Sequence, residues 1–301
     1  MPGTVEKIVA DADKHLSDIT AIVYSQDHVF TSGGDGKVKI WTKDLSLKKE
    51  IAVHEAWIYA MAVDSLGRIY TSSCDGTIRC LLNPLQSDDV KELLKCSDEI
   101  ESLYVDSKDN LWSGDDKGIV TMWVDHKIKF KFNLVEQVRS LAIQNNLIYS
   151  IRDNDLTITE VLEGSATGRY ITKASVPGKC PVVLCGTCSN NVHSNLAIIT
   201  RDGLGITLIR NNSKEHFSVQ WTKEKAHDMI INCVLGANEL LYTAGYDGIV
   251  KQWTSLEKDP KLAEEVNTGS GCLNALCLGS ERTIVYVGGS DGLLKMVRFS
   301  A

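Results

Sequence analysis

The sequence has little proline and no long apolar run. Its 301 residues include only 5 prolines, and no Pro-rich or Gly/Ser-rich stretch is typical of a linker. No stretch reaches the roughly 18 apolar residues that a membrane helix needs. Residues 1–15 also lack the apolar core of a secretory signal. We therefore expect a single domain over residues 1–301 that does not insert into a membrane.

Positive charge is too scarce for a broad nucleic-acid surface. The 32 Lys and Arg residues are outnumbered by 39 Asp and Glu residues, so the formal net charge is −7. Because an acidic protein repels phosphate backbones, we expect no nucleic-acid partner. A hydrophobic content of 43% with 24% charged residues is ordinary for a globular protein.

The 9 cysteines are odd in number and lie mostly in apolar, strand-like runs. With no export signal, this favours reduced thiols in the cytoplasm or the nucleus. The spacing of Cys180, Cys185, Cys188 and His193 could on paper bind zinc. Because Cys180 to Cys185 spans a predicted strand, whose side chains alternate between faces, we expect no metal site there.

Motifs of catalysis and cofactor binding are absent as well. The sequence contains no nucleophile elbow, no phosphate-binding glycine loop and no HExxH motif. We therefore expect no cofactor and no catalytic residue, and predict that the protein is not an enzyme.

What the sequence does contain is a repeat. A two-residue Asp-Gly-like turn followed by a short apolar strand recurs at steps of about 40 to 47 residues, a period typical of arrays of four-stranded units. The turns are Asp35-Gly36, Asp75-Gly76, Lys117-Gly118, Asp202-Gly203, Asp247-Gly248 and Asp291-Gly292, with a worn copy at Asn154-Asp155. The repeats run from about residue 18 to residue 299.

Each unit is predicted to form four short strands. In the first, runs rich in β-branched and aromatic residues are separated by turn residues, which favours antiparallel strands. These runs are 19–23, 28–31, 38–41 and 47–53. Runs that correspond to its first strand recur at 58–63, 100–105, 138–143, 180–184, 231–235 and 273–278. The sequence thus predicts seven units.

This pattern resembles the WD-repeat β-propeller family over nearly the whole chain. In that family a His before the first strand, a Ser or Thr on the second, an Asp in the turn and a Trp on the third form a hydrogen-bonded tetrad. The first unit matches it at His15, Thr31, Asp35 and Trp41, and the sixth at His227, Thr243, Asp247 and Trp253. The resemblance implies structural, not catalytic, roles for these residues.

Other units match less well. The second keeps His54, Thr71 and Asp75 with Leu81 at the Trp position, and the third keeps Ser113 and Trp123 with Lys117 at the Asp position. Units four, five and seven have Glu160, Leu208 and Val297 where Trp would stand.

The resemblance predicts an all-β, seven-bladed WD-repeat β-propeller. The last unit reaches only its third strand at 295–299, while residues 5–10 are similar to the fourth strand of unit one. We therefore expect residues 4–11 to form the outer strand of the last blade, which leaves only short outer sheet edges.

For function, the resemblance implies a protein-interaction scaffold whose top face binds a partner peptide. Carried onto this sequence, the family's top-face positions place aromatic residues beside an acidic wall, with basic residues across the channel. We expect partner binding by Trp57, Tyr59, Glu99, Glu101, Asp116, Arg139, Arg201 and Tyr246. The bound segment is expected to be basic, and the protein a monomeric propeller within a complex.

Two alternatives come from other classes. One is a constitutive architectural subunit of a larger complex; its variant, a ubiquitin-ligase receptor, is disfavoured because no Trp-Asp-x-Arg motif follows Trp41, Trp123 or Trp253. The other is a propeller hydrolase with a divalent metal in the channel.

Overall fold

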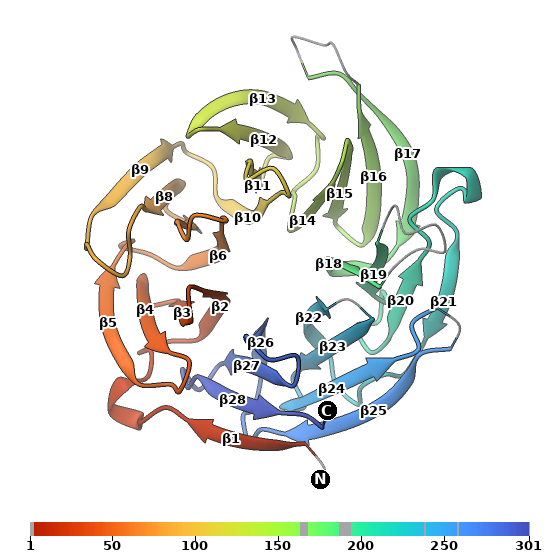
Figure 1. The fold of residues 1–301 in the computed structure, drawn as a ribbon. Helices are drawn as coiled ribbons and strands as arrows, with labels where there is room; N and C mark the ends of the chain where they lie inside the picture. Colours follow the sequence, from red (N-terminus) through yellow and green to blue (C-terminus); the bar gives the residue numbers. More distant parts are fainter. Residues whose placement is uncertain (1–2, 163–167, 187–193, 238, 258, 301) are drawn as a thin grey trace. The chain divides into compact units, whose positions relative to one another are not determined.

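The computed structural model describes residues 3–162, 168–186, 194–237, 239–257 and 259–300. Within these residues it contains seven four-stranded sheets and no α-helix (Figure 1). Strands follow one another in chain order within each sheet except the last, which takes its fourth strand from the N-terminus. The predicted all-β, seven-bladed propeller is confirmed.

The blades are numbered in chain order. Blade one contains β2 (Ile19–Ser25), β3 (His28–Gly33), β4 (Lys37–Thr42) and β5 (Leu47–Ala52). Blade two contains β6 (Ile58–Val63), β7 (Ile69–Ser73), β8 (Thr77–Leu81) and β9 (Val90–Lys95). Blade three contains β10 (Ile100–Val105), β11 (Leu111–Asp115), β12 (Ile119–Val124) and β13 (Lys127–Asn133). Blade four contains β14 (Ser140–Gln144), β15 (Leu147–Arg152), β16 (Asp155–Val161) and β17 (Tyr170–Pro177).

Blade five contains β18 (Lys179–Cys185), β19 (Asn195–Ile199), β20 (Ile206–Ile209) and β21 (Val219–Lys223). Blade six contains β22 (Ile231–Ala237), β23 (Leu240–Gly245), β24 (Ile249–Thr254) and β25 (Lys261–Asn267). Blade seven contains β26 (Leu273–Leu278), β27 (Ile284–Gly289), β28 (Lys295–Arg298) and β1 (Thr4–Ile8). Two short 3-10 turns, η1 (Asp11–Asp13) and η2 (Ser213–Glu215), lie between strands.

Strand β1 completes blade seven. It pairs antiparallel with β28, from Thr4 opposite Arg298 to Ile8 opposite Lys295. The strand ends three residues earlier than expected, because the chain turns into η1 at Asp11. An N-terminal strand therefore closes the last blade, as predicted.

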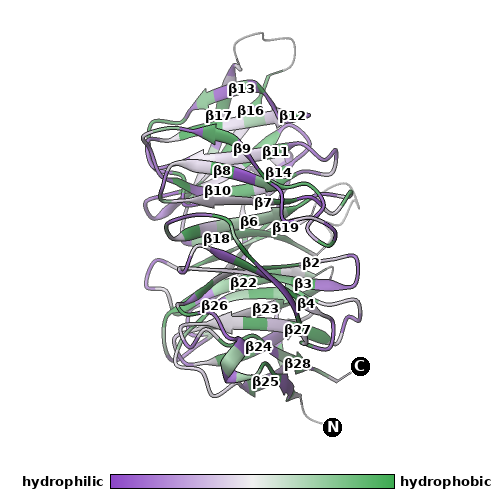
Figure 2. Cartoon of the chain, turned by 90° about the vertical axis from the view of Figure 1, so that its left-hand side faces the viewer, coloured by the Kyte–Doolittle hydropathy of each residue, from purple (hydrophilic) through white to green (hydrophobic). Residues whose placement is uncertain are grey.

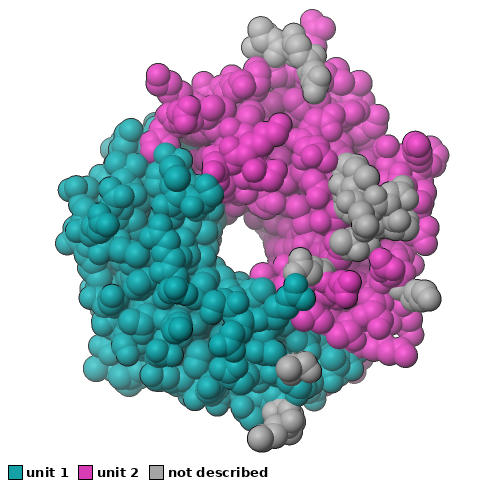
Figure 3. Space-filling view, viewed as in Figure 1, with its two compact units in different colours: residues 1–100, 242–252, 262–301 teal, residues 101–241, 253–261 magenta. Residues whose placement is uncertain are grey.

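Contacts between residues divide the chain into two compact units (Figure 3). The first, residues 1–100, 242–252 and 262–301, contains all of blades one, two and seven. The second, residues 101–241 and 253–261, contains blades four and five and all of blade three after Ile100.

Apolar side chains fill the space between neighbouring blades. In the first unit Trp41 of blade one packs in the same cluster as Tyr286 of blade seven, and a second cluster joins blades one and two. In the second unit Phe132 of blade three and Ile148 of blade four share a cluster, and another joins blades four and five. Hydrophobic residues concentrate on the strands and many loops are hydrophilic, as Figure 2 shows.

Blade four departs from the predicted strand bounds. Its central turn is Asp153-Asn154, one residue earlier than the predicted Asn154-Asp155, because Asp155 already pairs with Arg152 across the hairpin. Its first strand begins at Ser140 instead of residue 138, since the Val138 backbone N–H donates to Asp115 of the neighbouring blade, N···O 3.0 Å. A shorter turn, with Asp153 at a positive φ of 52°, replaces the glycine turn of the other blades.

Candidate functional site

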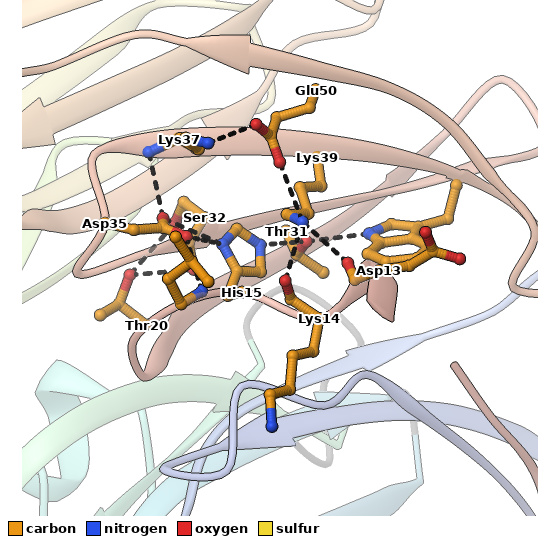
Figure 4. Close-up of polar contacts among 12 residues, drawn as sticks. Asp13, Lys14, His15, Thr20, Thr31, Ser32, Asp35, Lys37, Lys39 and Glu50 are labelled. Carbon is orange, nitrogen blue, oxygen red and sulfur yellow. Dashed lines mark hydrogen bonds and ion pairs between the residues drawn. The ribbon is translucent and has the colours of Figure 1, made fainter. Parts of the chain in front are cut away.

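Side-chain hydrogen bonds of the blade-one tetrad connect the segment before β2 with β3, with the turn after β3 and with β4 (Figure 4). His15, just before β2, lies with Nδ1 3.0 Å from Asp35 Oδ1 and Nε2 2.8 Å from Thr31 Oγ1. The Trp41 indole donates to the same Thr31 oxygen, with Nε1 2.9 Å away. All groups are satisfied when His15 donates to Asp35 and accepts from Thr31, so the carboxylate fixes the ring orientation.

Electrostatics favour a charged aspartate in this network. Burial raises the pKa of Asp35, but the hydrogen bond and charge of His15, with backbone N–H groups of Leu16 and Lys37, lower it by more. In blade two, burial lowers the pKa of His54 below its usual value despite the neighbouring Asp75. The His54 imidazole is therefore neutral at pH 7. Neither histidine has the exposure or the free nitrogen that a general base needs.

The four candidate residues of blade six are individually well placed for the same role. His227, Thr243 and Trp253 are buried, and Asp247 Oδ1 accepts the backbone N–H of Ile249 at 3.1 Å. Their assignment as a second tetrad stays a prediction.

Two blades that lack the full tetrad use substitute residues that the tetrad pattern does not predict. In blade three, where Lys117 stands at the turn position, Asp115 Oδ1 caps the turn by accepting the N–H of Ile119 at 2.7 Å. In blade seven the buried Lys295 ammonium lies 2.9 Å from Asp291 Oδ2 and 2.6 Å from Ser270 Oγ. The Lys295 ammonium thus contacts the turn aspartate of blade seven, as the His15 imidazole contacts Asp35 in blade one.

A basic residue four positions after the turn aspartate is a sequence signal that could have revealed the role of Lys295. Lys39 of blade one donates to the carbonyls of Asp13 and Lys14, each at 2.8 Å. Arg79 of blade two donates to the carbonyl of Val53. These third-strand cations hold the loop that carries the histidine, a role that the sequence analysis missed.

In the first unit, Trp57, Tyr59 and Glu99 form what we call the aromatic corner. Trp57 stands directly before β6 and Tyr59 within it, and both are exposed, by 39% and 36%. The Tyr59 hydroxyl donates to Glu99 Oε2 at 2.7 Å. The Trp57 ring lies against Gly34, where an added Cβ would come within 2.8 Å of Cε3. Contact with the Gly34 backbone therefore fixes the exposed Trp57 indole, and the bond to Glu99 fixes Tyr59 two residues later.

In the second unit, Glu101 and Arg139 belong to one hydrogen-bonded chain. Gln137 donates from Nε2 to Glu101 and accepts from Arg139 Nε at 3.1 Å. Arg139 was expected across the channel from the acidic residues, but the structure connects it to Glu101 through one side chain. The reason is that β14 directly follows blade three, so its first residues lie beside β10. Asp116 lies 3.3 Å from the Lys117 ammonium.

The remaining candidates are Arg201 and Tyr246. Arg201 forms an ion pair with Asp155 at 2.5 Å, at the edge of a polar cavity of about 410 Å³ that Asp153 and Lys179 also line. Tyr246 is 47% exposed. Among the predicted partner-binding residues, the structure thus connects Tyr59 with Glu99, and Glu101 with Arg139 through Gln137.

The thiols considered for zinc binding lie partly outside the described residues, since Cys188 and His193 belong to the segment 187–193. Burial raises the pKa of Cys180, and it raises that of Cys185 to about 12, so both favour the thiol form over the metal-binding thiolate. Across the described residues, no group of three or more His, Cys, Asp or Glu side chains could hold a metal ion. In the same part of the chain, no helix is long and apolar enough to span a membrane.

Comparison with known proteins places these features in a family. The WD40 family (WD domain, G-beta repeat) matches residues 7–42, 45–80 and 219–254. No curated protein matches the sequence. Among solved structures, the WD40 beta propeller domain of Doa1 is similar over 99% of this chain and 97% of that chain, with 15% identity and a TM-score of 0.77. The computationally designed Ika8 protein is similar over 95% of this chain and 98% of that chain, with 16% identity and a TM-score of 0.66. The chain is therefore a seven-bladed β-propeller that carries WD40 repeats.

Proposed function

We propose that this protein is a non-catalytic interaction scaffold, and that its aromatic corner captures an arginine- or lysine-bearing segment of a partner protein. WD-repeat propellers are commonly scaffolds for protein interactions and are typically non-enzymatic. The single observation that carries the finer proposal is the pair of exposed aromatic residues Trp57 and Tyr59, of which Tyr59 is hydrogen-bonded to the Glu99 carboxylate.

The chemistry of the corner suits a guanidinium. A cation over the face of an indole or phenol gains about 0.5–2 kcal/mol as the site dries. Glu99 forms no ion pair with any cation that the structure describes, so its charge is available to a ligand. Arginine suits this pairing better than lysine, because its planar group can stack on a ring and bind a carboxylate together.

The geometry limits the entropy lost on binding. Trp57 is held by the backbone at Gly34, and its carbonyl accepts the N–H of Cys74 at 3.1 Å. Tyr59 is held through its hydroxyl by Glu99. Side chains that are already fixed lose less freedom when a partner arrives, which favours affinity.

The test is affinity purification of tagged protein from its native cells, with quantitative mass spectrometry of the proteins that copurify. Three variants are compared with the wild type: Trp57→Ala, Glu99→Lys and Leu66→Ala. Leu66 is 66% exposed and lies between β6 and β7, away from the strand start that carries Trp57, so it is the matched control.

We expect Trp57→Ala and Glu99→Lys to lose the same set of partners, at least tenfold each, while Leu66→Ala keeps them. Thermal melting checks that the variants fold. Should both corner variants retain the full set of partners at physiological salt, the corner is not the interaction surface. An architectural role through other surfaces would then explain the partners better.

A further inference from the structure

The outer strand of blade three differs in charge from five of the other six outer strands, and it carries three lysines where β21 (Val219–Lys223) of blade five carries one. Strands β1, β5, β9, β17 and β25 each carry a charged residue that pairs with its neighbouring strand, such as Glu50 with Lys39 and Lys173 with Glu160. Strand β13 carries lysines at 127, 129 and 131 and no acid, and β12 beside it has no charged residue. These lysines form no ion pair with any residue in the described ranges.

An apolar cavity of about 280 Å³ opens beside this strand, within the second unit. Trp112, Met122 and Phe130 of blade three and Leu147 and Val161 of blade four line it, and Lys108 lies at its rim. The Trp112 ring is fixed by a hydrogen bond from Nε1 to Asp106 Oδ2 at 2.9 Å. The cavity is therefore walled by large side chains from two packed blades.

Lysine also borders the aromatic wall. The Lys129 ammonium lies 5.7 Å from the centre of the Phe130 ring, and Lys108 forms no ion pair with the described residues. Two cations without acidic partners thus flank an apolar cavity on a protein whose net charge is −7. Such a site attracts an anionic ligand that carries an apolar group.

We propose that this cavity is a docking site for an acidic segment of a partner protein that inserts one bulky apolar side chain, such as phenylalanine. The volume lies just below the range of about 300–1,000 Å³ typical of small-molecule sites, and suits a single large side chain. The edge of β13 carries no further strand. Its first residues therefore offer main-chain hydrogen bonds to the flanking residues of that segment, whereas the Asn133 carbonyl already accepts from the Tyr170 hydroxyl. A second copy of this chain is disfavoured, because pairing β13 with itself brings lysine against lysine.

The test uses a fluorescein-labelled peptide, Gly-Glu-Asp-Glu-Phe-Glu-Asp-Gly, and fluorescence polarisation with the full chain. We expect saturable binding with a dissociation constant below about 1 mM. Replacing the phenylalanine of the peptide by alanine should raise that constant about tenfold. Lys108→Glu with Lys129→Glu should weaken binding about tenfold, because attraction becomes repulsion at two positions. The control is Lys48→Glu with Lys223→Glu, which makes the same charge change at exposed lysines of the outer strands β5 and β21.

A second variant tests the cavity without changing charge. Val161→Phe places a ring inside it and should abolish binding while the protein remains folded by circular dichroism. The proposal is overturned if the peptide does not saturate, if the control pair loses as much affinity as Lys108→Glu with Lys129→Glu, or if the alanine peptide binds equally. It is also overturned if only anionic lipid vesicles bind in a manner that depends on Lys108 and Lys129. Trp57→Ala should leave peptide binding unchanged, which separates this site from the aromatic corner.

Discussion

Removing the turn aspartate should cost more in blade one than in blade two, although the two networks share three residue types. In blade one, Asp35 is the sole side-chain acceptor that His15 Nδ1 contacts within the described residues, with both oxygens at 3.0 Å. In blade two the Thr77 hydroxyl also lies 3.0 Å from His54 Nδ1, beside Asp75 Oδ2 at 3.1 Å. Asp35→Ala therefore leaves the His15 Nδ1–H donor without an acceptor. Asp75→Ala instead leaves the Thr77 hydroxyl as a substitute acceptor for His54 Nδ1.

The magnitude follows from burial. The His15 side chain is fully enclosed, and a buried donor without a partner costs about 1–3 kcal/mol. We expect about 2–3 kcal/mol for Asp35→Ala, since water cannot reach the imidazole. For Asp75→Ala we expect about 1 kcal/mol, because Thr77 can rotate its hydroxyl and accept from His54. Asp75 is also more exposed than Asp35, at 20% against 7%, so water can replace part of what it does.

The assay is urea unfolding of both variants, compared at a common slope of free energy against denaturant. Asp11→Ala is the control, since Asp11 is 81% exposed and pairs only with Lys14 among described residues. It should change stability by less than about 0.5 kcal/mol. The reasoning is refuted if Asp75→Ala costs as much as Asp35→Ala, or if neither differs from the control.

Acid provides an independent check on the same carboxylate. The pKa of Asp35 is lowered in the folded state, so its contribution to stability is present above the unfolded pKa of about 3.9. That contribution is lost as the pH falls through the lower, folded value. The stability difference between wild type and Asp35→Ala should therefore shrink below about pH 4 and stay constant from about pH 5 to 7. A difference that grows on acidification would contradict the assigned sign.

Three further predictions concern other parts of the chain. Lys295→Met should leave the Asp291 carboxylate without its cation and cost about 3 kcal/mol in urea unfolding; adding Asp291→Asn should restore part of that loss. Deleting residues 1–10 should remove the partner of β28 and lower stability by several kcal/mol, with faster amide hydrogen exchange in β28 as the measurement; unchanged exchange would contradict this. Gly34→Ala should displace the Trp57 ring and weaken partner capture in the affinity purification, without removing any aromatic group.

The sequence predicted those features of the fold that local physics determines. Gly36 and Gly248 have positive φ values of 72° and 67°, a conformation that glycine adopts without strain, so Asp-Gly pairs locate the turns reliably. Alternation of apolar residues located the first strands at 58–63, 100–105 and 273–278 with the bounds that the structure has. Blade four was placed less well, because Asp153 adopts the positive φ without a glycine to signal it.

The candidate sites were harder to predict because they depend on contacts between distant residues. The hydrogen bond of Gln137 to Glu101 joins residues 36 positions apart, and the sequence around neither residue indicates that they meet. The cavity beside Phe130 arises where two blades pack, so no single repeat contains it. Asp115 shows the same limit, since it caps the turn of blade three from outside the usual aspartate position, where Lys117 stands. The position of a residue in a repeat predicts the strand or turn on which it lies, whereas the partners of its side chain depend on neighbouring blades.

The network around His54 connects the stability of blade two to the aromatic corner. His54 stands three residues before Trp57, and its ring is held by Asp75 and Thr71 while its backbone N–H donates to Gly36 at 2.9 Å. These bonds fix the start of the segment that carries the indole. A variant that loosens them should therefore weaken partner capture without touching the corner, because a mobile indole must be ordered at the moment of binding. Asp75→Ala is such a variant, and its effect on capture should fall between those of Leu66→Ala and Trp57→Ala.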